Sequence, residues 1–187
     1  MREIKTRNEL PLLLNDLNLI NIGVEIGVER GEYSEIILKN SNLKILYSVD
    51  SWKEMSDDEY QDINNHPQKK HDENKKETEQ RLSQFGGRSK TLHMISEEAS
   101  RQFEDNSLDF CYIDANHSYQ GCKKDIELWY PKVVKNGVMA FHDFIPDGIY
   151  SEGVFGVQGV IQEFIKRYEL ELFVTIDDAW PTCYIIK

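Results

Sequence analysis

Apolar runs of strand length recur along the chain and are separated by helical patterns. Five of them, rich in Val and Ile with little polar alternation, are Ile22–Val28, Lys44–Val49, Thr91–Ile95, Leu108–Ile113 and Gly137–Phe141. Continuous apolar runs of this length are typical of parallel strands buried on both faces. Because parallel strands need crossover connections, the pattern predicts an α/β sheet with right-handed crossovers.

Helical periodicity fills the spaces between these runs. A helix is predicted from Tyr33 onward, directly after Gly31. Between Tyr119 and Val133, apolar residues recur at spacings of three and four, which predicts one buried helix face. Asn136-Gly137 is a typical C-terminal stop, so this helix is expected to end there.

The end of the chain has a different pattern. Leu170–Ile176 and Thr182–Ile186 are strand-like, and only residues 177–181 separate them. So short a link cannot hold a crossover helix, and we expect an antiparallel hairpin. The expected sheet therefore has five parallel strands followed by a terminal antiparallel pair.

The segment 53–90 differs in composition from the rest of the chain. It is strongly charged, poor in aliphatic residues and carries His66-Pro67 in its middle. We interpret it as a charged, partly helical and mobile insertion in a single domain that spans residues 1–187. Two roles stay open for it, a solvated helix pair or a lid over a substrate site.

Composition narrows the classes of partner. The 187 residues carry a net charge of −11. This acidity argues against a nucleic-acid binder and against anionic membrane surfaces, because phosphate groups need clustered Lys and Arg. A neutral or small substrate fits the charge better.

The cysteines and the N-terminus suggest a compartment. Cys111, Cys122 and Cys183 are scattered and show no CxxC spacing, so we expect buried thiols in a reducing environment. No run of about 18 apolar residues occurs, and the chain from Met1 onward is polar, without a signal-peptide core. These features favour a cytoplasmic location.

The loop Glu25–Gly31 follows the first predicted strand and opens a helix, where α/β sheets bind ligands. A glycine there lets the backbone approach a ligand closely. The spacing matches neither GxGxxG nor a P-loop, because Gly23, Gly27 and Gly31 lie four apart and no Gly-Lys-Ser/Thr follows. The remaining pattern, ExGxxxG, places an acid where it would repel a pyrophosphate but suit a cation.

This loop resembles that of class I S-adenosylmethionine-dependent methyltransferases. The resemblance implies that Glu25, Gly27 and Gly31 hold the methionine and ribose part of the cofactor. Asp50, with Ser51 beside it, ends the second strand about 20 residues further on, where a ribose diol is bound in such folds.

The third strand ends at Ile95-Ser96, which two acidic residues follow. Ser96 in this setting is a good helix N-cap. The resemblance also places this turn beside the adenine, with Ile95 packed on the ring and Ser96 near its edge. The capping role and the cofactor contact both stay open, and they are compatible.

A more specific resemblance covers about Ile22 to Phe144. Its markers are Ile113-Asp114, His117, Tyr119, Asp125, Trp129, Asn136-Gly137 and Phe141-His142-Asp143. Together they resemble a methyltransferase subfamily related to sugar and macrolide O-methyltransferases of the macrocin type. The resemblance implies a Rossmann-like seven-stranded sheet of order 3-2-1-4-5-7-6, with its last strand antiparallel and helices on both faces.

Four residues form the candidate reaction centre. Asp114 ends the fourth strand, next to the end of the fifth strand at His142 and Asp143, and His117 follows nearby. In one interpretation Asp114 and Asp143, with His142 as a third ligand, bind a divalent cation such as Mg²⁺. Related enzymes carry an acid pair or Asp-Asn where this chain has His-Asp. In the other interpretation no metal is needed, and His117 or His142 is the general base. Asp114 is also expected to contact the cofactor.

The sequence thus predicts S-adenosylmethionine-dependent O-methylation of a small molecule or sugar. An NAD- or nucleotide-sugar-dependent oxidoreductase is an alternative, and the absence of GxGxxG and of a Tyr-xxx-Lys pair counts against it. A non-catalytic binding protein that keeps the cofactor fold is another alternative. The methyl acceptor and the oligomeric state, a homo-oligomer included, stay open.

Overall fold

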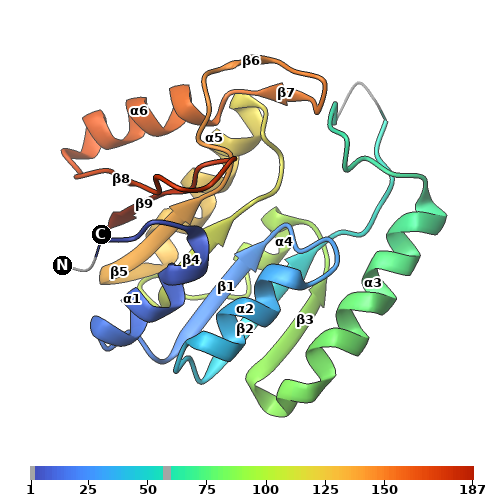
Figure 1. The fold of residues 1–187 in the computed structure, drawn as a ribbon, viewed down its shortest axis with the longest axis horizontal. Coiled ribbons are helices and arrows are strands. Elements are labelled where there is room, and N and C mark those ends of the chain that lie inside the picture. The colour runs from blue at the N-terminus through green and yellow to red at the C-terminus, as the bar shows by residue number, and fades with distance from the viewer. Residues whose placement is uncertain (1–2, 57–59) are drawn as a thin grey trace.

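The computed structural model describes residues 3–56 and 60–187 and contains a seven-stranded sheet between two layers of helices (Figure 1). The order of the strands is β3-β2-β1-β4-β5-β9-β8. The strands are β1 (Ile22–Ile26), β2 (Ile45–Asp50), β3 (Ser89–His93), β4 (Leu108–Ile113), β5 (Val133–Phe141), β8 (Phe173–Val174) and β9 (Cys183–Ile186). A separate two-stranded ribbon consists of β6 (Gly148–Ile149) and β7 (Val154–Phe155). Without this ribbon the order is 3-2-1-4-5-7-6, which confirms the predicted sheet.

Helices cover both faces of the sheet, because the strand side chains that point to either face are mostly apolar. One face packs against α1 (Leu10–Asp16), α2 (Glu32–Asn40) and the end of α3 (Gln68–Leu82). The other face packs against α4 (Ser96–Ser100), α5 (Tyr119–Trp129) and α6 (Val157–Tyr168). Short 3₁₀ turns lie at Arg7–Glu9, Ser83–Arg88 and Tyr130–Lys132.

The strand directions agree with the predicted hairpin. Strand β1 is parallel to its neighbours β2 and β4, so the carboxyl ends of these strands meet at one edge. Strand β9 is antiparallel to both β5 and β8. The last strand is therefore the antiparallel one, as expected from the short link that precedes it.

The predicted end of the helix that begins at Tyr119 is wrong. Helix α5 ends at Trp129, and Val133 begins β5, where it pairs with Leu108. Pro131 lacks a backbone N–H and cannot continue the helical ladder, which explains the earlier end. Asn136, with φ of +65°, and Gly137 lie inside the irregular first half of β5.

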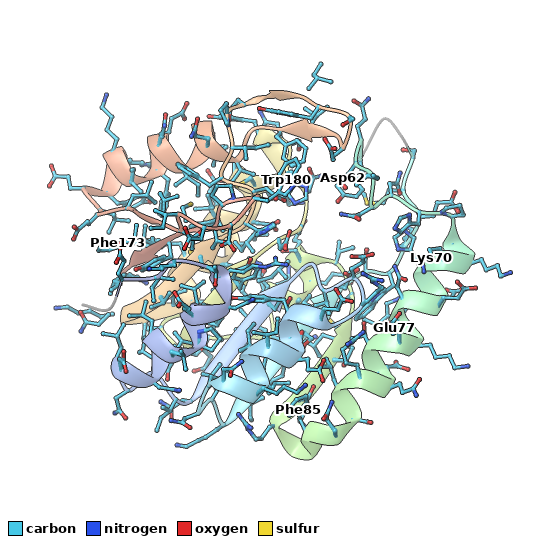
Figure 2. All side chains as sticks on the ribbon, in the orientation of Figure 1. Asp62, Lys70, Glu77, Phe85, Phe173 and Trp180 are labelled. Carbon is cyan, nitrogen blue, oxygen red and sulfur yellow. The ribbon has the colours of Figure 1, made fainter. Side chains whose placement is uncertain are left out.

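The charged segment 53–90 contains α3, which is the crossover between β2 and β3. The side chain of Arg81 bonds Glu35 at 3.1 Å and the backbone carbonyl of Arg30 at 3.0 Å, so α3 is attached to α2 and to the glycine loop. Residues 57–59 of this segment lie outside the described residues. Asp62 lies in the connection before α3, and residues 61–63 pair with the ribbon β6–β7 near Gly153 (Figure 2).

The three cysteines are buried, as the sequence predicts. Cys111, Cys122 and Cys183 are free thiols, and all three are buried in β4, α5 and β9. In the part of the chain that the structure describes, none of the helices is long and apolar enough to cross a membrane.

Candidate active site

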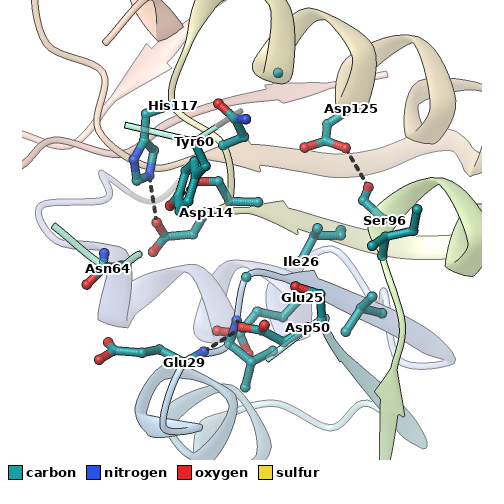
Figure 3. A pocket seen from close by; sticks show the side chains of 18 of the residues that line it. Glu25, Ile26, Glu29, Asp50, Tyr60, Asn64, Ser96, Asp114, His117 and Asp125 are labelled. Carbon is teal, nitrogen blue, oxygen red and sulfur yellow. Dashed lines mark hydrogen bonds and ion pairs between the residues drawn. The ribbon is translucent and has the colours of Figure 1, made fainter. Parts of the chain in front are cut away.

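A cavity of about 400 Å³ lies at the carboxyl ends of β1, β2 and β4 (Figure 3). Its lining includes the predicted cofactor residues Glu25, Gly27, Asp50, Ser51, Ile95, Ser96 and Asp114. It also includes His117 from the predicted reaction centre. Gly31 is the exception among the predicted cofactor residues, because it lies outside this lining and precedes α2. One space therefore reaches both the predicted cofactor residues and the reaction centre.

The glycine loop is shaped by the backbone of β4. Gly27 has φ of +83°, and a Cβ there would lie 1.7 Å from the backbone oxygen of Asp114. Gly31 has φ of +74°, and a Cβ there would lie 3.0 Å from Thr78 on α3. The spacing of these glycines therefore follows from close backbone approach inside the fold as well as from ligand access.

Asp50 ties the glycine loop to the end of β2. One carboxylate oxygen accepts hydrogen bonds from the backbone N–H groups of Val28 and Glu29, both at 2.9 Å. The other oxygen accepts from the N–H of Trp52 at 2.7 Å. A carboxylate has about four acceptor positions, so these bonds leave room for a ligand hydroxyl.

Glu25 is a buried acid at the end of β1. It accepts a hydrogen bond from the hydroxyl of Ser34. Burial raises the pKa of Glu25 to about 8, although the bond from Ser34 works in the opposite direction. The carboxyl group is therefore mostly neutral at pH 7, and a nearby cation would favour its ionised form.

Ser96 does not have the predicted capping role. The N-cap of α4 is Ile95, and no side-chain hydrogen bond caps this helix. The hydroxyl of Ser96 instead donates to Asp125 and accepts from the indole N–H of Trp129 at 2.8 Å. Burial raises the pKa of Asp125 to about 6. The hydroxyl of Ser96 is thus engaged by partners on α5 and not by the backbone N–H groups at the start of α4. Ile95 remains 46% exposed at the cavity.

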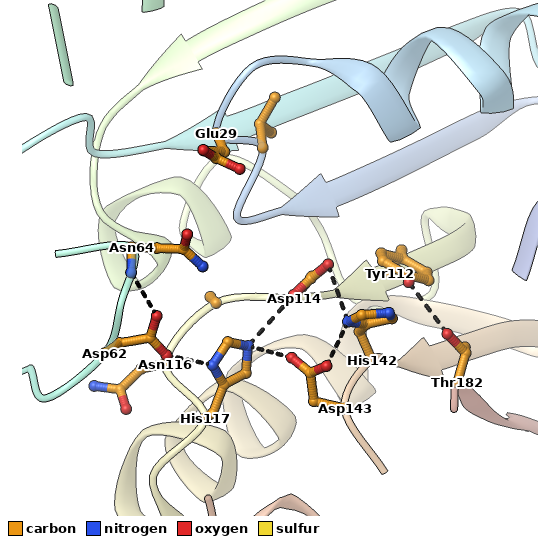
Figure 4. A network of polar contacts seen from close by, with 12 residues as sticks. Glu29, Asp62, Asn64, Tyr112, Asp114, Asn116, His117, His142, Asp143 and Thr182 are labelled. Carbon is orange, nitrogen blue, oxygen red and sulfur yellow. Dashed lines mark hydrogen bonds and ion pairs between the residues drawn. The ribbon is translucent and has the colours of Figure 1, made fainter. Parts of the chain in front are cut away.

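A cluster of imidazole and carboxylate groups lies beside the cavity (Figure 4). His117 is its centre: Nδ1 lies 2.7 Å from Asp62, and Nε2 lies 2.8 Å from Asp143 and 3.3 Å from Asp114. His142 completes the cluster, with Nδ1 2.8 Å from Asp143 and 3.5 Å from Asp114. The structure therefore brings the four predicted reaction-centre residues together.

Not every member of this cluster reaches the cavity. Asp114 and His117 line it, whereas His142 and Asp143 lie outside the lining that the described residues form. Sequence reasoning missed Asp62, which lies in the charged segment with no periodic pattern to mark it. The ring of Phe155 in β7 stacks on His117 with centroids 5.0 Å apart, so the ribbon β6–β7 covers this imidazole.

The carboxylates change the ionisation of both histidines. Burial alone would lower the pKa of His117, but bonds to Asp114, Asp143 and Asp62 raise it well above the ordinary value. Burial works to lower the pKa of His142 as well, but Asp114 and Asp143 raise it to about 9. Burial works to raise the pKa of Asp114, yet the two histidines hold it well below its usual range. Both imidazoles are therefore cationic at neutral pH in this arrangement.

Three of these groups have the geometry of metal ligands. His117 and one carboxylate oxygen each from Asp114 and Asp143 offer atoms within 4.8 Å of one another. Here His117, not the predicted His142, joins the two acids. An imidazole in the set fits a transition metal better than Mg²⁺, which prefers oxygen ligands. Asp62 would hold the other ring nitrogen of His117, as outer carboxylates do in such sites.

Comparisons with known proteins agree with the fold of the chain. A family model described as a methyltransferase domain matches residues 24–144. A Staphylococcus aureus protein, provisionally named a caffeoyl-CoA O-methyltransferase, has a TM-score of 0.68 at 18% identity, covering 95% of this chain and 81% of that chain. An O-methyltransferase from Bacillus cereus in complex with SAH has a TM-score of 0.65 at 14% identity, covering 96% and 80%. TomG from Streptomyces achromogenes, an O-methyltransferase in complex with SAM, has a TM-score of 0.64 at 12% identity, covering 97% and 79%.

A search of curated protein sequences finds no significant match. The solved structures share the fold of this chain at low sequence identity. The family model, in contrast, covers well over half of the sequence and includes the glycine loop, Asp50 and the reaction centre. The chain belongs to the class I S-adenosylmethionine-dependent methyltransferases.

Proposed function

We propose that the chain transfers the methyl group of S-adenosylmethionine (SAM) to an oxygen atom of a small molecule or sugar. The observation that carries this proposal is the single cavity that joins the predicted cofactor residues to Asp114 and His117. A donor held along one part of this space would present its methyl group to an acceptor at the other part. The O-methyltransferase names of the similar structures support an oxygen acceptor.

The lining suggests how the cofactor lies. The exposed face of Ile95 suits the adenine ring, with Ser96 at the edge of the ring. Asp50 suits the ribose hydroxyls, because it ends the neighbouring strand. The methionine end would then lie at Glu25 and Gly27, and the sulfonium would face Asp114.

The reaction in this proposal is a direct displacement. The acceptor oxygen attacks the methyl carbon, the carbon–sulfur bond breaks, and S-adenosylhomocysteine (SAH) leaves. The hydroxyl proton of the acceptor passes to a base, for which His117 is the candidate because it borders the cavity. Asp143 would position His117 and balance its charge, and His142 would hold Asp143 in place. Holding the acceptor in line with the methyl group supplies much of the rate increase.

The raised pKa of His117 constrains this role. An imidazolium cannot accept a proton, so His117 must lose its own proton before it acts as a base. A cation held by Asp114, His117 and Asp143 would supply a Lewis acid that lowers the pKa of an acceptor hydroxyl. The two routes differ in their response to chelators, because only the second needs a metal.

Transfer of a labelled methyl group tests the proposed function. Purified protein is incubated with methyl-labelled SAM and a panel of catechols, phenols and sugars, with EDTA or with added Zn²⁺, Mn²⁺ or Mg²⁺. Label is expected on an acceptor oxygen, and His117→Asn is expected to lower the rate at least about 100-fold. His93→Asn is the matched control, because His93 lies outside the cavity lining. In a parallel incubation NAD replaces SAM, and reduction of NAD there without any methyl transfer from SAM would refute the proposal.

A further inference from the structure

Arg7 is a cavity residue that none of the recognised motifs includes. It begins the 3₁₀ turn Arg7–Glu9 before α1, and it lines the cavity together with Glu25 and Gly27. Its side chain is 32% exposed, so it is partly open to the cavity. The N-terminal segment thus supplies a cation to a space whose other walls come from the strand ends.

The backbone and ring contacts of Arg7 hold it in place. Its backbone N–H donates to Asp178 at 2.8 Å, and its backbone carbonyl accepts from the hydroxyl of Tyr33 at 2.7 Å. The guanidinium carbon lies 4.8 Å from the centre of the Tyr33 ring. Arg7 is therefore attached to both α2 and the loop before β9.

The guanidinium still has donors available. Its Nη1 lies 3.3 Å from the hydroxyl of Tyr112 and 3.3 Å from Asp114. Within residues 3–56 and 60–187, Nε and Nη2 have no hydrogen-bond partner among the contacts of Arg7. A guanidinium carries five N–H donors in a planar fork that matches a carboxylate. The unused part of this fork can bind an anion in the cavity.

The charges at and beside Arg7 are complementary to those of an amino-acid group. The methionine end of SAM carries an ammonium group and a carboxylate side by side. Glu25 and Asp114 offer acidic groups, and Arg7 offers the opposite charge directly beside Asp114. The other arginine and lysine side chains of the described lining are engaged or elsewhere: Arg30 pairs with Glu29 and Glu32, Lys124 pairs with Glu97, and Lys53 follows the end of β2 beyond Asp50. The His117 imidazole is held by three carboxylates.

We infer that Arg7 binds the α-carboxylate of the methionine end of the cofactor and so selects for a ligand with an intact amino-acid group. This inference rests on the proposed function, since it requires that SAM occupies the cavity. It assigns the N-terminal segment a direct part in the cofactor site. Asp114 holds the guanidinium while the remaining N–H groups of the fork face the ligand.

A pair of ligands that differ in one group tests the inference. SAM and decarboxylated SAM are titrated calorimetrically into the wild-type protein, Arg7→Met and Arg7→Lys. A charge-assisted hydrogen bond predicts that Arg7→Met weakens SAM binding about 10- to 100-fold. The affinity for decarboxylated SAM should change by less than about 3-fold or become stronger, because the repelling guanidinium is gone. Arg7→Lys keeps the charge without the fork, so it should lie between.

The control is Arg30→Met, another lining arginine, which should affect both ligands equally if it affects either. Equal weakening of both ligands by Arg7→Met, or no weakening of SAM, would overturn the inference, because a structural role does not distinguish the carboxylate. If Arg7→Met does not fold, the wild type and Arg7→Lys still test the inference. A wild-type protein that binds SAM and decarboxylated SAM with equal affinity would overturn the inference as well. A wild-type protein that binds neither ligand would instead refute the proposed function.

Discussion

Glu25 is expected to release a proton when the cofactor binds. Burial raises its pKa to about 8, so about 0.9 of the molecules carry a neutral Glu25 at pH 7. The ammonium and sulfonium groups of SAM would favour the carboxylate, because an opposite charge stabilises the ionised form. Bound protein is therefore expected to hold the ionised carboxylate, and the proton must leave during binding.

The size of the effect follows from this pKa. With a free-state pKa of about 8, the number of protons released by Glu25 falls from about 1 at pH 6 to about 0.5 at pH 8. The affinity for SAM should rise about 50-fold over the same range, because less energy is needed to remove the proton. The pKa of His142, about 9, keeps that histidine protonated through most of this window.

The assay is calorimetry of SAM binding in buffers with different enthalpies of ionisation. The slope of binding enthalpy against buffer enthalpy gives the number of protons released. Glu25→Gln keeps the size of the side chain and its bond with Ser34, but it cannot ionise, so the difference between the two proteins isolates Glu25. Equal proton release by wild type and Glu25→Gln at pH 7 would refute the reasoning.

Three further predictions concern stability and the histidine cluster. Gly27→Ala should lower the free energy of unfolding by at least about 2 kcal/mol in urea titrations, whereas Gly87→Ala, where an added Cβ meets nothing within 4 Å, should have a small effect. His142, with its pKa raised from 6.5 to about 9, should contribute about 3 kcal/mol of stability below pH 6.5, and this is lost as the pH rises through 9. The unfolding free energies of wild type and His142→Asn should therefore converge by pH 10, and a constant difference would contradict this. Asp62→Asn should lower the pKa of His117, seen by NMR titration of its ring in metal-free protein; an unchanged titration would show that Asp62 has no influence.

Most of the sheet could be predicted from the sequence because its strands are buried on both faces. Val24 and Cys111, for example, lie in apolar runs of strand length and are fully buried. The short link before Thr182 likewise left only a hairpin. The start of β5 could not be predicted, because Val133 continues the helical spacing of α5 while Pro131 has already ended the helix.

The candidate site was predictable where its residues end a strand or, as with His117, follow one closely. Glu25, Asp50 and Asp114 follow apolar runs, so the parallel topology places them at one edge. Asp62 and Arg7 lie in polar segments, and only the tertiary fold brings them to His117 and Asp114. The role of Ser96 was also not predictable, because its local sequence indicates a helix cap whereas its hydroxyl bonds side chains on α5.

Calorimetric titration of the wild-type protein with SAH and with NAD, side by side, tests the central claim most directly. SAH should bind one site per chain, and Asp50→Asn should weaken it, because Asp50 both orders the glycine loop and faces the cavity. NAD should give no binding heat. Binding of NAD without any binding of SAH would contradict the account.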